Sequence, residues 1–92
     1  MWYVYILECE NDFLYTGVTQ DIYKRFQEHF VGAGAYFTGY RNPKRIAYFE
    51  PLETEVLAKQ RESQIKSWSR SKKQALIQGD LQRLQQLSVS RD

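Results

Sequence analysis

The chain has 92 residues, with 13 lysines and arginines, 11 aspartates and glutamates, and 42% hydrophobic residues. This length allows one folded domain and excludes a second independent core, and the apolar content excludes an intrinsically disordered chain. The net charge of +2 is too small to indicate a nucleic-acid partner by itself. Because Cys9 is the only cysteine, an intramolecular disulfide and a multi-cysteine metal site are excluded, which favours a reducing cytoplasmic location. With neither a secretion signal nor an apolar run of bilayer length, we expect no membrane contact.

The first part of the chain is expected to form a β-hairpin. Two β-branched and aromatic runs, at 2–9 and 13–19, flank turn-forming residues at 10–12. A three-residue loop would pair residue 5 with residue 17 and would place Tyr5 and Tyr15 diagonally on one face of the sheet. A loop of only Asn11 and Asp12 would place them on opposite faces. The sequence leaves both registers open.

A helix is expected to follow the hairpin. Thr19 or Asp21 can cap it, because either side chain can accept a hydrogen bond from an otherwise unpaired backbone N–H. Arg25 and His29 lie on the flank of its apolar stripe, which consists of Ile22, Phe26, Phe30 and Ala33. Glycines at 32 and 34 predict its end, and residues 32–44 are predicted to form a long loop.

The second half of the chain predicts one strand and two or three helices. The strand covers 45–50 and is closed by Pro51. A helix from Glu53 and Thr54 to about Trp68 carries Glu62 at the edge of an inner face made of Leu57, Ala58, Ile65 and Trp68.

Ser69 or Ser71 can cap a further helix that ends at Gly79. We therefore expect a domain over 1–79 and a C-terminal helical extension or tail over 80–92, where leucines recur at helical spacing. The predicted class is α/β, more specifically α+β.

Five residues could together perform phosphodiester hydrolysis: Tyr5, Tyr15, Arg25, His29 and Glu62. They supply groups that can accept a proton, a cation for the developing negative charge, and a carboxylate for a hard metal ion. A single carboxylate is an acceptable anchor for Mg²⁺, which keeps several of its waters. Taken singly, each residue also has an ordinary structural explanation. Glu62 with Lys66, for example, is a routine helix pair at i,i+4.

The joint spacing of these residues resembles the GIY-YIG nuclease family. Tyr3-Val4-Tyr5 precedes Tyr15-Thr16-Gly17 by about ten residues, an arginine follows eight residues after that glycine, and a glutamate lies on a later helix. The likeness covers residues 2–79 and is nearest to small stand-alone bacterial members. The same domain occurs in excision-repair and junction-cleaving nucleases and in homing and restriction endonucleases.

The resemblance implies a three-stranded antiparallel sheet flanked by helices, and one-metal hydrolysis of phosphodiesters. It implies that Tyr5 and Tyr15 are the motif tyrosines, that Arg25 neutralises the scissile phosphate and that Glu62 holds Mg²⁺ or Mn²⁺. His29 falls where many relatives have a histidine near the active surface. Further nucleic-acid contacts are expected from Gly17, Thr38, Arg41, Lys44 and Lys66.

This sequence departs from the family pattern at three places. Tyr3 replaces the glycine of the first tripeptide, and Thr16 replaces the middle residue of the second. In the 32–44 loop, Tyr36 and Phe37 stand where many relatives have a lysine and a tyrosine.

The leading hypothesis is a divalent-metal-dependent endonuclease that acts on DNA, with structured, branched and single-stranded DNA among its candidate substrates. Either tyrosine could act as the general base. A protein partner that supplies specificity is among the expected partners, because no DNA-recognition domain is appended. The alternatives are a nucleic-acid-binding or partner-docking module on the same scaffold, and self-association through the C-terminal leucines.

Overall fold

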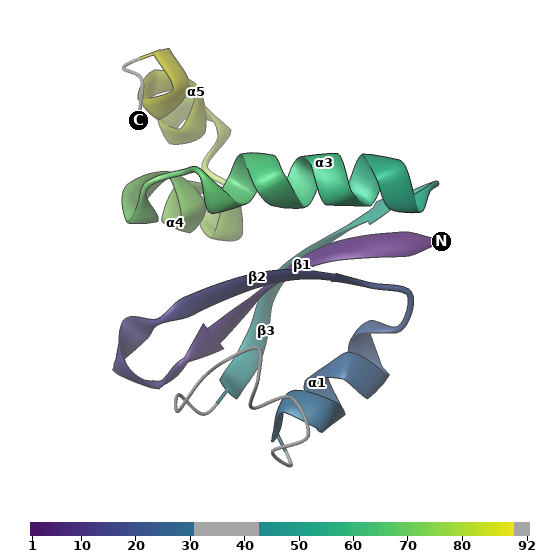
Figure 1. Cartoon of the computed structure of the whole chain (residues 1–92). Coiled ribbons are helices and arrows are strands. Elements are labelled where there is room, and N and C mark those ends of the chain that lie inside the picture. Colours follow the sequence, from purple (N-terminus) through teal and green to yellow (C-terminus); the bar gives the residue numbers. More distant parts are fainter. Residues whose placement is uncertain (31–42, 90–92) are drawn as a thin grey trace.

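The computed structural model of the chain describes residues 1–30 and 43–89 (Figure 1). Its centre is a sheet of β1 (Trp2–Cys9), β2 (Leu14–Thr19) and β3 (Pro43–Leu52), in the order β2-β1-β3. Both neighbouring pairs are antiparallel. The predicted three-stranded antiparallel sheet is therefore confirmed, with β2 and β3 at its two edges.

Helices cover the two faces of this sheet unequally. The helix α1 (Ile22–Phe30) lies on one face, and α3 (Glu55–Lys66) and α4 (Arg70–Gln78) lie on the other (Figure 1). The last helix, α5 (Leu81–Val89), extends beyond α4 (Figure 1). The fold is α+β, as expected. In the described ranges, no helix has the length and apolar character that crossing a membrane requires.

The hairpin has the three-residue connection that brings both motif tyrosines to one face. A short 3₁₀ turn, η1 (Glu10–Asp12), joins the strands, and the Cys9 N–H donates to the Phe13 carbonyl across it at 2.8 Å. Asn11 and Asp12 both have φ of 60°, a left-handed conformation that these two residue types tolerate better than most. Tyr5 consequently pairs with Gly17, and Leu7 pairs with Tyr15.

The alternation of side chains along β1 divides the core into two layers. Val4 and Ile6 face α3 and α4 and pack with Leu14, Ala58, Ile65 and Leu76. Tyr5, Leu7 and Cys9 face the opposite way, where Phe26 of α1 packs against them. Every residue of β1 from Val4 to Leu7 is buried, as expected for the central strand.

Strand β3 is longer than predicted and includes Pro51. The sequence predicts a strand over 45–50, whereas β3 covers Pro43–Leu52 and Pro51 pairs with Tyr3. Proline is tolerated here because β3 is an edge strand, where a missing N–H does not break pairing with a further strand. The ladder is irregular near Ala47, since Tyr48 pairs with Ile6 while Ile46 pairs with Leu7.

The helix caps follow side chains that the sequence identifies. The Asp21 carboxylate accepts from the Lys24 N–H at 3.0 Å, and the hydroxyls of Thr54 and Ser69 accept from the first turns of α3 and α4. Gly79 ends α4 with φ of 70°. The assignment of Leu57 to the inner face of α3 is wrong, because its side chain is 45% exposed. Ala58 occupies that face instead, and adjacent helical residues point about 100° apart.

The C-terminal segment forms a helix that partly joins the core. Leu84 of α5 packs against the layer formed by α3 and α4, whereas Leu81 is 73% exposed. Part of the predicted extension over 80–92 thus contributes to the fold.

Thr16 provides a test of this layering. It is 4% exposed, it faces α3 because it pairs with Ile6, and its hydroxyl has no hydrogen-bond partner among the residues that the structure describes. Thr16→Val removes a buried unsatisfied hydroxyl and keeps the β-branched shape, so we expect the free energy of unfolding to rise by about 1 kcal/mol in urea denaturation. Thr19→Val is the control. The Thr19 hydroxyl accepts from the Asp21 N–H at 3.1 Å, so its loss should destabilise the fold.

Candidate active site

The candidate site begins with the packing of Tyr5 against Gly17. The two residues face each other across the β1–β2 ladder, and Tyr5 is 1% exposed. A Cβ atom added to Gly17 would lie 2.5 Å from the Tyr5 hydroxyl oxygen and 2.6 Å from the ring carbon that carries it. The absence of a side chain at residue 17 therefore provides the space in which the Tyr5 hydroxyl lies.

Tyr15 stands beside Tyr5 on the same face. Their ring centroids are 6.3 Å apart, with the ring planes inclined at 43°. Burial raises the pKa of both phenols above the ordinary value of about 10, most strongly for Tyr5. Tyr15 is the more exposed of the two and is therefore easier for a water molecule to reach.

Arg25 approaches the tyrosine pair from α1. Its guanidinium donates a hydrogen bond to the Tyr5 hydroxyl, and its positive charge lowers the pKa of both phenols, against the larger effect of burial. It also forms an ion pair with Glu28 at 3.3 Å, one turn further along the helix. The Asp21 cap fixes where α1 begins, and thereby where Arg25 lies relative to the sheet.

Glu62 approaches from α3, on the other side of the sheet. Its negative charge raises the pKa of Tyr5 and of Tyr15, which shows that the carboxylate lies in the electrostatic neighbourhood of both phenols. Its side chain is 22% exposed, and Lys66 Nζ lies 3.2 Å from its Oε2. The helix pair predicted from i,i+4 spacing is therefore present, alongside the proximity to the tyrosines.

An ion pair at the opposite edge of the sheet supports the rotation of α3 that the burial of Ala58 and Ile65 defines. Arg61 Nε lies 3.1 Å from Glu50 Oε2 of β3, and the Tyr48 hydroxyl donates to the other Glu50 oxygen at 2.7 Å. The Arg61 guanidinium also lies 5.2 Å from the centre of the Trp68 ring. Because consecutive helix residues point about 100° apart, holding Arg61 toward β3 turns Glu62 toward β2. The network thus orients the carboxylate toward Tyr15.

Burial, followed by the hydrogen bond to Glu50 and its charge, raises the pKa of Tyr48 to about 12, so this phenol stays protonated and keeps donating. This network was not predicted from the sequence. The alternation of Tyr48 and Glu50 along one face of a strand was the available signal, but nothing in the sequence pairs that face with Arg61.

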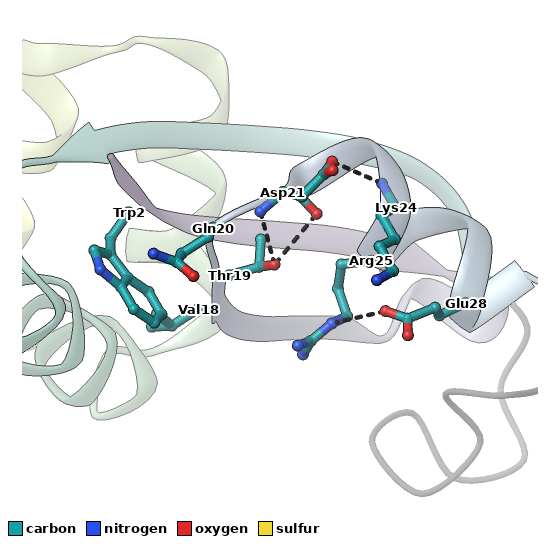
Figure 2. A pocket seen from close by; sticks show the side chains of 8 residues that line it. All are labelled: Trp2, Val18, Thr19, Gln20, Asp21, Lys24, Arg25 and Glu28. Carbon is teal, nitrogen blue, oxygen red and sulfur yellow. Dashed lines mark hydrogen bonds and ion pairs between the residues drawn. The ribbon is translucent and has the colours of Figure 1, made fainter.

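A pocket of about 300 Å³ adjoins Arg25 (Figure 2). Figure 2 shows that its lining comes from the start of β1, the end of β2 and the first turns of α1, in the form of Trp2, Val18, Thr19, Gln20, Asp21, Lys24, Arg25 and Glu28. The pocket therefore continues the candidate site along β2 beyond Gly17. Trp2 and Gln20 were not selected from the sequence, because only the fold brings them to Arg25.

The remaining predicted site residues lie either outside the described part of the chain or away from the tyrosine pair. His29 belongs to α1, and its side chain lies outside the described residues, as do Thr38 and Arg41 entirely. Lys44 is exposed at the start of β3, at the sheet edge opposite β2. The structure therefore brings together Tyr5, Tyr15, Gly17, Arg25, Glu62 and Lys66, and it leaves Lys44 apart from them.

The donor set suits a hard divalent cation held by one protein ligand. Within residues 1–30 and 43–89, no three His, Cys, Asp or Glu side chains are grouped closely enough to hold a metal. Glu62 would therefore act with water and substrate oxygens, which is a common way for proteins to bind Mg²⁺. Its carboxylate is partly exposed and its partner Lys66 is a surface side chain that can move aside, so these residues fit such an ion.

Comparison with known proteins gives the family. The model of the GIY-YIG catalytic domain matches residues 1–75. The chain belongs to the GIY-YIG family. This GIY-YIG domain is 46% identical over 76 residues to a UPF0213 protein of Haloquadratum walsbyi, with coverage of 83% of this chain and 85% of that protein. It is 44% identical over 75 residues to a UPF0213 protein of Staphylococcus saprophyticus, with coverage of 82% and 92%.

A solved structure supports the same assignment for the GIY-YIG fold. The solution NMR structure of a UPF0213 protein from Bacillus halodurans is similar with a TM-score of 0.54 and 38% identity, over 85% of this chain and 84% of that one. The relatives come from archaea as well as bacteria, so the expectation of a bacterial group is too narrow. The names of these relatives state no activity.

Gly17→Ala tests the packing on which this site depends. The added methyl group must displace the buried Tyr5 ring, so we expect a loss of about 1–3 kcal/mol in the free energy of unfolding. In a Tyr5→Leu background the same change should cost markedly less, and a double-mutant cycle measures the difference. Equal losses in the two backgrounds would contradict the contact.

A second prediction concerns stability at alkaline pH. The folded state holds the Tyr5 proton more tightly than the unfolded chain does, because burial raises the pKa of this phenol. The resulting stability is complete below about pH 10 and is lost as pH rises further, by up to about 1.4 kcal/mol per pH unit. Tyr5→Phe should therefore flatten the decline of the unfolding free energy above about pH 10, as measured by denaturation at a series of pH values. Tyr23→Phe, at a residue that is 72% exposed, is the matched control, and an equal decline in both variants would contradict the prediction.

Proposed function

We propose that this protein is a divalent-metal-dependent endonuclease that hydrolyses phosphodiester bonds in DNA. The observation that carries the proposal is the convergence of two phenols, a guanidinium and a carboxylate from β1, β2, α1 and α3 at one electrostatically coupled site. The membership of the GIY-YIG catalytic-domain family supports the same reaction class.

The proposed chemistry divides the work among these side chains. Water attacks the phosphorus atom while one tyrosine, as a phenolate, accepts the water proton. The bond from phosphorus to the leaving oxygen breaks, and that oxygen takes up a proton from solvent water. Arg25 stabilises the additional negative charge on the phosphate oxygens, because its planar guanidinium stays ionised and can donate two parallel hydrogen bonds. Mg²⁺ or Mn²⁺ on Glu62 would supply further neutralisation of phosphate charge.

In the free site, burial works against a phenolate, so the proposed proton transfer depends on nearby positive charge. With both phenol pKa values raised, the tyrosines are neutral near neutral pH and need additional positive charge before either can accept the water proton as a phenolate. Arg25 already acts in that direction on both. The proposal therefore makes hydrolysis dependent on Arg25 and on Glu62 together, rather than on either tyrosine alone.

Glu62→Gln provides the sharpest test of metal anchoring. The substitution keeps the shape and removes the charge, so we expect cleavage of a panel of duplex, single-stranded and branched DNA in Mg²⁺ or Mn²⁺ to fall by about 10²-fold or more. Glu55→Gln is the matched control, since Glu55 also pairs with a lysine at i,i+4 on α3, at 3.9 Å. Equal cleavage by both variants would refute the role of Glu62.

Arg25→Ala tests charge stabilisation at the phosphate. Loss of one donor to the developing charge typically costs about 10²–10³-fold in rate. The fall should appear in single-turnover cleavage at saturating protein, because the proposed interaction strengthens in the transition state. Salt-sensitive DNA binding without cleavage by the unaltered protein would instead favour the binding-module alternative.

A further inference from the structure

A cluster of positive charge lies where α3 meets α4, next to the hairpin. Residues 63–79 contain four lysines and arginines and no acidic residue. Lys72 points toward the Trp68 ring, with Nζ 4.5 Å from the ring centre. The other three, Lys66, Arg70 and Lys73, form what we call the α4 basic cluster.

The members of this cluster differ in how their charge is neutralised. Lys66 pairs with Glu62, and an Arg70 guanidinium nitrogen donates to the main-chain carbonyl of Asp12. Lys73 makes no ion pair with any described residue. Burial lowers the pKa of Lys73, and the charges of Arg70 and Lys66 lower it further. Two of the three positive charges thus lack a carboxylate partner in the described ranges.

A pocket adjoins these charges. It has a volume of about 190 Å³ and is lined by Phe13, Leu14, Arg70 and Lys73. Phe13 and Leu14 immediately precede Tyr15 in the chain, so this pocket lies at the start of β2. The pocket that Trp2 and Gln20 line lies at the other end of the same strand. Arg70 is held in place by its bond to the hairpin turn, so its guanidinium is already ordered before a ligand binds.

We propose that the α4 basic cluster binds the phosphate backbone of the DNA strand beside the bond that is cleaved. This inference rests on the proposed function. Along β2 the pocket lies four residues from Gly17, or about 13 Å at the usual rise of a strand. That distance corresponds to about four base steps of duplex DNA, so one strand can reach both the tyrosine pair and the cluster.

The chemistry of the cluster favours a phosphodiester backbone as its ligand. A guanidinium and an ammonium at a partly apolar pocket suit phosphate oxygens, and neither cation needs sequence-specific base contacts. A free nucleotide offers one phosphate group at the pocket, whereas a continuous backbone engages the pocket and the candidate active site together. DNA binding here should therefore depend on salt more strongly than binding of a free nucleotide.

The test is DNA binding by the full chain in the absence of divalent metal. Fluorescence anisotropy with a labelled oligonucleotide, over a range of salt concentrations, measures affinity and its salt dependence. For Lys73→Gln we expect affinity to fall by about fivefold and the slope of log K against log salt to decrease by about one. Lys73→Arg should restore most of the affinity, because it keeps the charge. Lys59→Gln removes one charge from an exposed side chain in the first half of α3 and is the matched control.

The outcomes separate this inference from the proposed function. If the unaltered protein neither binds nor cleaves DNA, both fail. If it cleaves, and Lys73→Gln binds as tightly as the unaltered protein, the proposed function stands and the cluster is not a backbone site. Equal weakening by Lys73→Gln and Lys59→Gln also overturns the inference, since it would reflect net charge alone. Thermal unfolding of each variant verifies that the fold is kept.

Discussion

The close approach of the Tyr5 hydroxyl to the backbone of Gly17 is the contact on which the candidate site depends. It requires Tyr5 to pair with Gly17 across the hairpin, and that pairing in turn requires the three-residue turn at Glu10–Asp12. A shift of one residue in the ladder would move Tyr15 to the face covered by α3 and separate it from Tyr5. Two left-handed residues in a short turn therefore determine whether the phenols meet.

The two charged side chains of the site, Arg25 and Glu62, are positioned by interactions outside the site. The Asp21 cap sets the start of α1 and hence the position of Arg25. Burial of Ala58 and Ile65 defines the inner face of α3, and the Glu50–Arg61 ion pair on the far edge of the sheet agrees with that rotation, which directs Glu62 toward β2. Four elements thus supply one side chain each, and none of the four can form the site alone.

The sequence predicts the elements and the motif residues more fully than their contacts. The alternating pattern and the turn residues predict the hairpin, and the capping residues locate the starts of α1, α3 and α4 to within a residue or two. The sequence could not choose between a two- and a three-residue turn, because Asn11 and Asp12 suit both. It also misplaced Leu57, whose burial depends on which face of α3 packs on the sheet, and Ala58 and Ile65 occupy that face against β1.

Electrostatic effects between residues distant in the chain were the feature least predictable from the sequence. Lys66 and Glu62 were recognisable as a helix pair, but the effect of the Glu62 charge on two phenols arises only after α3 packs across the sheet. The pockets at the two ends of β2 likewise combine residues from separate elements, such as Trp2 with Arg25 and Phe13 with Lys73. The fold thereby adds to the motif residues two pockets, one at each end of β2.

The central claim is that these side chains form one site for a divalent cation and a phosphate at the β2 edge. Paramagnetic broadening by Mn²⁺ in amide NMR spectra of the free protein tests it most directly. The account predicts selective broadening at Glu62, Tyr15 and Gly17, with little effect at Lys44 on the opposite edge. Broadening centred on the acidic residues of the hairpin turn, or spread evenly over the protein, would contradict it.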